Sequence, residues 1–314
     1  MCTLIGIAIV VNEVRRRGSR REKKRKYVLI VVADDFGISE SRNRGIVEAI
    51  RQGAVGRTSI MANGAARDQA VESALKSFDL SVGLHLNLTE GRPLSKLSRV
   101  KSLLGEDGKT FKGKYEFRYK KNELNLAEVE NEVRAQIQWF RDKFKRSPLY
   151  VDGHQHCHVV SVEIARVIAR VFNEEGVRMT RIPQERSVNT SKTCVTCANV
   201  SREAKLACDI YESENIQYSK AFAGLTFCGQ TYSVNDLVNL ISNEFESVSK
   251  TCEDEIIYCD LMTHPGADIN SNTSSGSWDS FDESRDRVTE LKTLCDPSLL
   301  SVLSSHGIEL YKPH

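Results

Sequence analysis

Apolar and polar positions alternate along the chain in blocks that predict a repeating order of strands and helices. Continuous apolar runs, such as YVLIVVAD at residues 27–34, are typical of strands buried in a parallel sheet. Such runs predict strands at residues 27–34, 57–63, 80–88, 148–154, 177–182, 221–227, 255–262 and 307–311. Stretches with one apolar face predict helices after Ser39, before Leu75 and at residues 126–145, 160–175, 234–248 and 281–294.

This alternation favours an α/β architecture. We expect a single domain folded as a distorted TIM-like (β/α) barrel, with an open doubly wound sheet as the alternative. The sequence contains neither GxGxxG nor GxxxxGK[ST], which counts against a nucleotide-binding sheet. Residues 91–122 are rich in Lys and Gly and predict a long loop or lid, whereas residues 185–215 predict a polar surface insertion.

The amino-acid composition is compatible with this fold but does not by itself predict it. A chain of 314 residues can bury a full core, and 40% hydrophobic with 27% charged side chains is ordinary for a globular protein. The balance of 44 basic against 42 acidic side chains leaves a net charge of +2. We therefore expect no nucleic-acid partner.

The basic excess is concentrated near the N-terminus, in RRRGSRREKKRK at residues 15–26. We expect residues 1–26 to form a basic, disordered arm outside a barrel domain at residues 27–314. The apolar stretch at residues 4–11 is shorter than the roughly 20 residues of a membrane-spanning helix. Its charges follow it, unlike those of a secretory signal. These features predict a cytoplasmic protein without a membrane span.

Nine cysteines without a recognisable secretory signal favour free thiols in a reducing compartment. Cys194 and Cys197 form a lone CVTC, and a structural zinc site normally needs a second pair of ligands. The pair alone therefore does not predict a zinc site. Cys157 lies between histidines, but it faces the other side of an extended segment, and we do not expect it to bind a metal.

Acidic and imidazole side chains gather where four predicted strands end. The segments are VVADDFG (31–37), VGLHLNL (82–88), YVDGHQHCH (150–158) and CDLMTHPG (259–266), and they hold five of the seven histidines. Side chains at one end of the strands of a parallel barrel converge on one point. The pattern predicts a metal-dependent hydrolase with its site at that end.

The first and third of these segments offer several groups suited to metal chemistry. Asp34 and Asp35 are adjacent carboxylates, so one can bind a metal while the other acts as a base. His154, His156 and His158 alternate and would share a face while the strand lasts. Their spacing does not choose among them.

The remaining candidates each have a structural alternative. His85 is either a metal ligand or a buried core histidine, and Asp152 either orients an imidazole or ends a strand. His264 is either a loop residue or the proton donor to a leaving group. Arg181 and Glu185 either orient the site or form an ion pair.

Several motifs together resemble those of the YdjC-like, ChbG-type carbohydrate deacetylases. They are ADDFG, the NG at residues 63–64, GLHLNLTEGRPL, DGHQHCHV, the R-x-P-x-E at residues 181–185 and THPG. The resemblance covers residues 27–311, and it implies a distorted TIM-like barrel, a divalent metal and hydrolysis of N-acetyl groups from acetylated, chitooligosaccharide-like sugars. It also implies a possible homodimer.

The resemblance further implies roles for single residues. The proton acceptor is Asp34, and the candidate general acid is His264. The metal, Mg²⁺ by this resemblance, is held by Asp35, His85 and His154. This leaves His156 and His158 to line or support the pocket.

Three questions stay open at this point. A set of two histidines and one carboxylate also suits zinc, iron or cobalt. The same fold could belong to a non-catalytic protein that binds a metal or a sugar. A metal-dependent phosphoesterase would also use Asp and His, usually around two metals.

Overall fold

The computed structural model describes residues 25–76, 81–187, 195–268 and 280–313. Most of the predicted arm and Cys194 lie outside these residues. Within them, eight parallel strands form one sheet, in the order β5-β4-β3-β2-β1-β7-β6 with β8 paired to β1. The strands are β1 (Lys26–Phe36), β2 (Arg57–Met61), β3 (Ser81–Leu86), β4 (Tyr150–Gly153), β5 (Met179–Thr180), β6 (Ala221–Ala223), β7 (Ile256–Thr263) and β8 (Ile308–Leu310).

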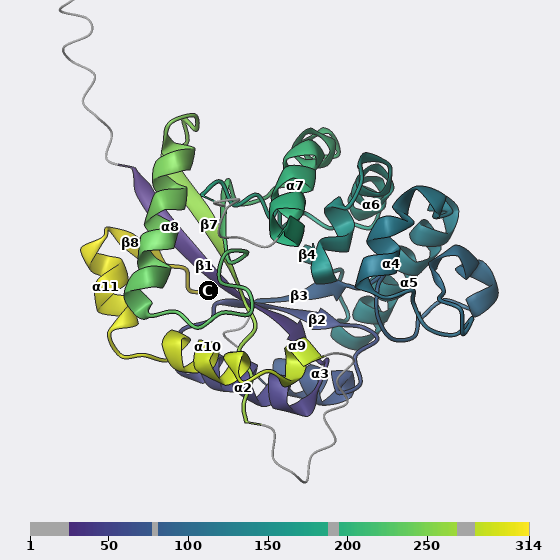
Figure 1. Cartoon of the computed structure of the whole chain (residues 1–314), viewed down its shortest axis with the longest axis horizontal. Coiled ribbons are helices and arrows are strands. Elements are labelled where there is room, and N and C mark those ends of the chain that lie inside the picture. The colour runs from purple at the N-terminus through teal and green to yellow at the C-terminus, as the bar shows by residue number, and fades with distance from the viewer. Residues whose placement is uncertain (1–24, 77–80, 188–194, 269–279, 314) are drawn as a thin grey trace, which may run out of the picture.

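Helices surround this sheet (Figure 1). They are α2 (Glu40–Arg51), α3 (Arg67–Leu75), α4 (Lys114–Tyr119), α5 (Leu126–Phe144), α6 (Val162–Glu174), α7 (Val195–Ser213), α8 (Val234–Ser249), α9 (Ser280–Glu283), α10 (Asp286–Leu294) and α11 (Leu299–Ser305). Short 3₁₀ segments are η1 (Leu97–Arg99), η2 (Lys101–Leu103), η3 (Lys121–Glu123) and η4 (His154–Val159). The predicted Ser39 cap is confirmed, because its hydroxyl accepts a hydrogen bond from the Arg42 amide.

The strand order is that of a barrel opened at one seam. Strands β1 to β5 follow one another in chain order, and β7 returns to the free side of β1, as the last strands of a (β/α) barrel do. The ends of the order are β5 and β6, so the sheet in the described residues is a half-barrel. The predicted distorted TIM-like barrel is therefore confirmed.

Strand β1 runs through the middle of the sheet and shows how its two faces differ. Its side chains alternate: Leu29, Val31 and Ala33 pack into the main apolar core, whereas Ile30 and Val32 belong to a separate small cluster. The main core therefore lies between the sheet and its helices. The other face looks into the half-barrel, where polar groups gather.

Every predicted strand is present, but two other predictions were wrong. The polar insertion predicted at residues 185–215 is wrong for the described part of that segment, because α7 buries Val200, Ala204 and Tyr211. The helix predicted at residues 281–294 is broken into α9 and α10, and α11 was missed. The predicted long loop at residues 91–122 contains α4, whose Phe117 is fully buried.

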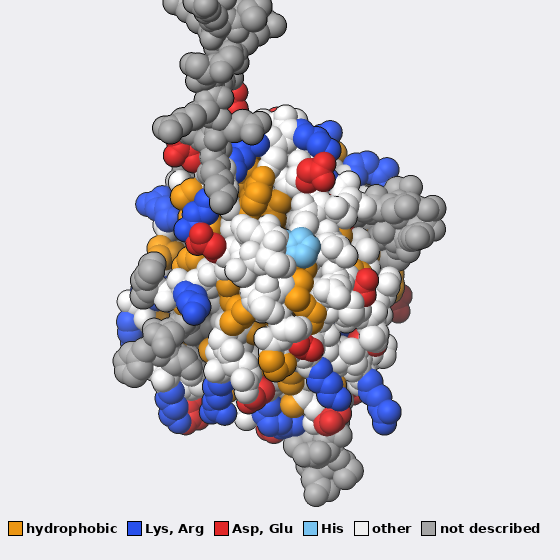
Figure 2. Space-filling model, turned by 90° about the vertical axis from the view of Figure 1, so that its left-hand side faces the viewer, with side chains coloured by type: hydrophobic (Ala, Val, Ile, Leu, Met, Phe, Trp, Pro, Cys, Tyr) orange, Lys and Arg blue, Asp and Glu red, His pale blue; other side chains and the backbone are white. Residues whose placement is uncertain are grey.

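The surface carries mixed charge on the side formed by α8 and α11. Basic and acidic side chains are interspersed on this face, with hydrophobic side chains between them (Figure 2). Among the described residues, no helix is both long enough and apolar enough to cross a bilayer.

Candidate active site

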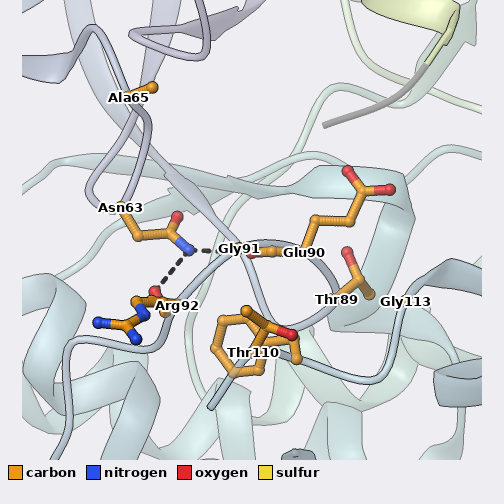
Figure 3. Close-up of a pocket in the computed structure, with 9 residues that line it drawn as sticks. Asn63, Ala65, Thr89, Glu90, Gly91, Arg92, Thr110 and Gly113 are labelled. Carbon is orange, nitrogen blue, oxygen red and sulfur yellow. Dashed lines mark hydrogen bonds between the residues drawn. The ribbon is translucent and has the colours of Figure 1, made fainter. Parts of the chain in front are cut away.

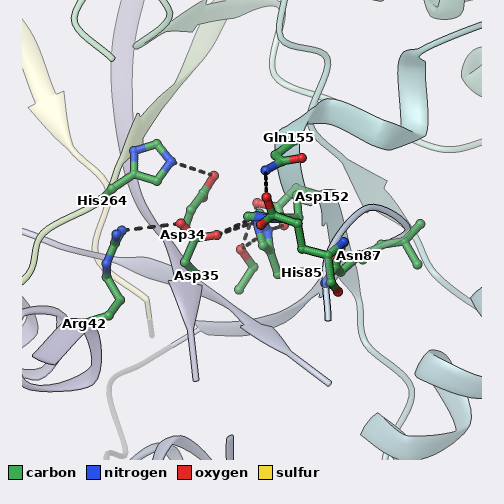
Figure 4. A network of polar contacts seen from close by, with 12 residues as sticks. Asp34, Asp35, Arg42, His85, Asn87, Asp152, Gln155 and His264 are labelled. Atoms are coloured by element: carbon green, nitrogen blue, oxygen red, sulfur yellow. Dashed lines mark hydrogen bonds and ion pairs between the residues drawn. The ribbon is translucent and has the colours of Figure 1, made fainter. Parts of the chain in front are cut away.

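One pocket collects the side chains that the sequence pattern placed at the ends of four strands (Figure 4). Its volume is about 520 Å³. It is lined by Asp34 and Asp35 on β1, His85 on β3, His154 directly after β4 and His264 directly after β7. The predicted convergence of these residues is therefore confirmed, at the carboxyl ends of the parallel strands.

The end of β1 turns so that both of its carboxylates face the pocket. Strand alternation alone would send Asp34 and Asp35 to opposite faces. However, the register of β1 shifts between Ala33 and Phe36, and Asp35 has a φ of 63°. Left-handed backbone is uncommon for a residue other than glycine and occurs often at functional sites. This local turn brings Asp35 to the same side as Asp34.

Two imidazoles converge on a single oxygen of Asp35. His85 Nε2 lies 3.1 Å from Asp35 Oδ1, and His154 Nδ1 lies 2.9 Å from the same oxygen. The ligand atoms of all three residues lie within 4.8 Å of one another, and all three residues are buried. Two imidazoles and one carboxylate form a donor set that fits a divalent cation.

Carboxylates hold the outer nitrogen of each imidazole. Asp152 Oδ1 lies 2.7 Å from His85 Nδ1, and Glu90 Oε2 lies 2.9 Å from His154 Nε2. This arrangement of carboxylate, histidine and metal orients the ring in many metal sites. It resolves the alternative for Asp152, which orients His85 and also accepts hydrogen bonds from Ser59 and Tyr150.

The same carboxylates favour the protonated form of both imidazoles. Although burial disfavours the charged form, Asp152 and Asp35 raise the pKa of His85 to about 10. Burial also disfavours the charged form of His154, but Asp35 and Glu90 have the larger effect and raise the pKa of His154 to about 9. The carboxylates of Asp35, Asp152 and Glu90 thus concentrate negative charge around the two imidazoles. A proton on each ring or a bound cation can balance this charge.

Glu90 was not singled out from the sequence, because it lies in the loop after β3 and meets His154 only in the folded chain. Asn63 Nδ2 donates to the main-chain carbonyls of Glu90 and Arg92, each at 3.0 Å (Figure 3). Asn87 Nδ2 donates to the Glu90 carbonyl as well, at 2.8 Å. The NG and GLHLNL motifs therefore fix the turn that presents Glu90 to the site.

Asp34 is paired with a buried arginine. The two terminal nitrogens of Arg181 lie 2.9 and 2.5 Å from the two oxygens of Asp34, and Nη2 is also 3.3 Å from Asp152. Burial raises the pKa of Asp34 to about 6, although Arg181 opposes this shift. Arg181 thus orients the site, whereas Glu185 does not: its carboxylate accepts the main-chain N–H groups of Gly224 and Leu225.

His264 faces Asp34 across the pocket. Its Nε2 lies 3.9 Å from Asp34 Oδ2. Its ring packs edge to face against Phe281, with 5.1 Å between the two ring centroids. Burial lowers the pKa of His264 well below the usual range, and Arg287 adds to this effect. The imidazole is therefore neutral near pH 7.

Arg42 is a fully buried cation that the sequence did not reveal, because a charged residue on a helix is usually solvated. Its Nη1 lies 3.4 Å from Asp35 Oδ2, and its Nη2 lies 2.7 Å from Asp282 Oδ1. Arg42 thus ties the start of α9 to the carboxylate on which the imidazoles converge.

The alternating geometry expected for the three clustered histidines is wrong. Strand β4 ends at Gly153, and the next residues form η4, in which Gln155 and His156 have φ values of 50° and 59°. The period-two argument applies only within a strand. Of the three imidazoles, only His154 reaches Asp35.

The other residues of η4 take supporting positions. His156 lines the pocket, whereas His158 Nε2 lies 2.7 Å from the main-chain carbonyl of Arg181 and so supports that residue. Cys157 points elsewhere, with its Sγ donating to the Leu86 carbonyl at 3.3 Å. The extended segment on which the expectation for Cys157 rested is absent, because these residues form η4.

Comparisons with known proteins agree over nearly the whole chain. The model of a family described as YdjC-like protein matches residues 28–305. A carbohydrate deacetylase of Homo sapiens is 36% identical over 293 residues, which cover 90% of this chain and 88% of that protein. A chitooligosaccharide deacetylase of Klebsiella pneumoniae is 36% identical over 152 residues, covering 48% of this chain and 58% of that protein.

One solved structure is similar throughout. It is the crystal structure of a protein from Enterococcus faecalis V583 described as a cellobiose-phosphate cleavage protein. The TM-score is 0.68 at 25% identity, and the match covers 91% of this chain and 97% of that one. The fold is therefore shared over 91% of this chain.

Proposed function

The chain belongs to the YdjC-like family, and from this premise we propose that it is a metal-dependent deacetylase of acetylated carbohydrates. The observation that supports the proposal most is the approach of two imidazoles to one oxygen of Asp35, each ring held from behind by a carboxylate. The relatives named carbohydrate deacetylase and chitooligosaccharide deacetylase suggest the reaction. The proposed substrate is an N-acetylated oligosaccharide.

In this proposal, the cation is held by Asp35, His85 and His154. A divalent cation supplies Lewis acidity, which lowers the pKa of a water molecule and polarises a carbonyl group. Mg²⁺ is the first candidate from the family resemblance, and the imidazole ligands also suit zinc or another transition metal.

Asp34 is the proposed general base. It takes a proton from the water that attacks the acetamide carbonyl, and its pKa of about 6 suits a base that works near neutral pH. The bidentate contact with Arg181 fixes the plane of the Asp34 carboxylate. The two adjacent aspartates therefore have different partners and different tasks.

His264 is the proposed route for the proton to the leaving group. The 3.9 Å between its Nε2 and Asp34 Oδ2 is longer than a hydrogen bond. In this proposal, the proton that Asp34 took from water therefore passes to the imidazole through a bridging water molecule or after the two side chains move closer. The imidazole then gives this proton to the sugar nitrogen as the carbon–nitrogen bond breaks. One proton leaves the water and one reaches the nitrogen, so the products are acetate and a free amino sugar.

The pocket has little room for the second cation that a two-metal phosphoesterase would need. Asp34, His85 and Asp152 form a second group of possible ligands in the described residues. However, the guanidinium of Arg181 already contacts both aspartates, at 2.5 and 3.3 Å. We therefore expect one metal per chain, and metal analysis distinguishes this from two.

The direct test is acetate release from short N-acetylated oligosaccharides by metal-reconstituted protein. The wild type is expected to release acetate, whereas Asp34→Ala and His154→Ala are expected to be inactive with unchanged circular dichroism. Binding of the sugar without acetate release would instead favour a non-catalytic binding protein. An active Asp34→Ala variant would remove the proposed base.

A further inference from the structure

Helix α4 presents an exposed aromatic ring at the mouth of the active-site pocket. Tyr115 lines this pocket, yet its side chain is 77% exposed. Tyr119, one turn later, is 87% exposed and is not among the residues that line the pocket. Single exposed aromatic residues are ordinary on protein surfaces, so the position of Tyr115 at the pocket is what distinguishes it.

The position of α4 is fixed by contacts that its other residues make. Phe117 is fully buried, and Arg118 Nη1 pairs with Glu203 at 2.6 Å. Arg118 Nη2 also donates to the main-chain carbonyl of Gln155 at 2.9 Å. The side chain of Gln155 in turn contacts Glu90, which holds His154. The helix is therefore tied to the candidate metal ligands, which places Tyr115 at the edge of their pocket.

The depth of the site determines which part of a substrate can meet this ring. Asp35 and His85 are at most 2% exposed, so a reacting acetyl group must enter the inner part of the pocket. The sugar that carries this group then occupies the pocket itself. The next sugar of the chain lies further out, at the mouth, where Tyr115 is exposed. A pyranose ring has an apolar C–H face, and a tyrosine ring offers a flat, rigid and amphipathic surface for it.

We propose that Tyr115 is a stacking platform for the second pyranose ring of the substrate, so that the site prefers oligosaccharides to monosaccharides. This inference rests on the proposed deacetylase function and specifies its substrate class. The aromatic face supplies the contact, and the hydroxyl group has no part in it. Phenylalanine should therefore replace Tyr115, and alanine should not.

The test compares kcat/KM for N,N′-diacetylchitobiose with kcat/KM for N-acetylglucosamine. In Tyr115→Ala, the ratio of the two values is expected to fall about twofold to tenfold, which corresponds to the loss of one aromatic contact of about 0.5–1.5 kcal/mol. Tyr115→Phe is expected to restore the ratio. Tyr119→Ala is the matched control, because it removes a similarly exposed tyrosine from the same helix, and its ratio should equal that of the wild type.

Two results would overturn the inference. An equal fall in kcat/KM for both substrates in Tyr115→Ala would mean that the ring only supports the fold of α4. Wild-type values of kcat/KM for both substrates would mean that the second sugar does not touch the ring. Calorimetric binding of the same two acetylated sugars to the same variants separates this inference from the proposed function. If the wild type releases no acetate, a selective loss of N,N′-diacetylchitobiose affinity in Tyr115→Ala still supports the platform, and equal affinities contradict it.

Discussion

The two faces of the central sheet are built from the same strands but hold different kinds of side chain. On the outer face, Leu29, Val31 and Ala33 of β1 pack against helices in a continuous apolar core. At the carboxyl end of the inner face, buried side chains form the network of Asp34, Asp35, Asp152, His85 and Arg181. Apolar burial stabilises the fold, whereas buried charges cost free energy unless they are paired. The outer face therefore determines stability, and the inner face determines chemistry.

The strongest test of this contrast on the inner face is Asp34→Asn. The amide cannot take a proton from water, so we expect acetate release per folded molecule to fall about 10²- to 10⁴-fold. Metal content should not change, because Asp34 is outside the proposed ligand set. Acetate release and metal analysis of the same sample check both statements. Near-normal turnover would show that another group is the base.

The matching test on the outer face is Phe172→Ala in α6. Phe172 is fully buried beside Tyr211, and its removal leaves a cavity in the apolar core. We expect the free energy of unfolding to fall by about 3–5 kcal/mol. Urea unfolding measures this change, and kcat/KM per folded molecule should stay at the wild-type value. A large loss of kcat/KM in the folded fraction would contradict the claim that the outer face affects stability alone.

A milder inner-face change removes the charge that orients a proposed ligand. In Asp152→Asn, His85 loses its carboxylate partner, and we expect metal affinity to fall about 10- to 100-fold. Glu90→Gln makes the equivalent change behind His154 and should have a similar effect. Titration with metal gives both dissociation constants. Unchanged affinities would mean that the two carboxylates do not support the rings.

The smallest expected effect is on an outer helix. Ser233 caps α8 through a reciprocal capping box with Asp236. Ser233→Ala should lower the free energy of unfolding by about 1 kcal/mol, because an amide at the helix start loses its partner. Thermal or urea unfolding detects this change. A simultaneous loss of metal would contradict the independence of the two faces.

The sequence predicted the parts of the site that lie on strands. Asp34, His85 and His264 follow apolar runs, and the geometry of parallel strands brings such positions together. It could not predict contacts made by loops and helices. Glu90 meets His154 across 64 positions of the chain, and Arg42 resembles any charged residue on a helix. Each depends on the tertiary fold rather than on local periodicity.

Backbone turns explain the other differences. The alternation of a strand predicts opposite directions for adjacent residues, but Asp35 and His156 adopt left-handed conformations that end this alternation. Helix α7 was missed because its segment is polar and contains few large apolar residues. Periodicity therefore located the elements better than it located their ends, where the site lies.

The central claim is that Asp35, His85 and His154 hold one divalent cation on which acetate release depends. It is tested most directly by metal content and acetate release, measured together for the wild type, His85→Ala and His154→Ala. His306→Ala is the matched control, because this exposed imidazole follows α11 and does not line the active-site pocket. We predict one metal per chain and full activity for the wild type and the control, and neither metal nor acetate release for the other two. One bound metal with normal acetate release in His154→Ala would contradict the account.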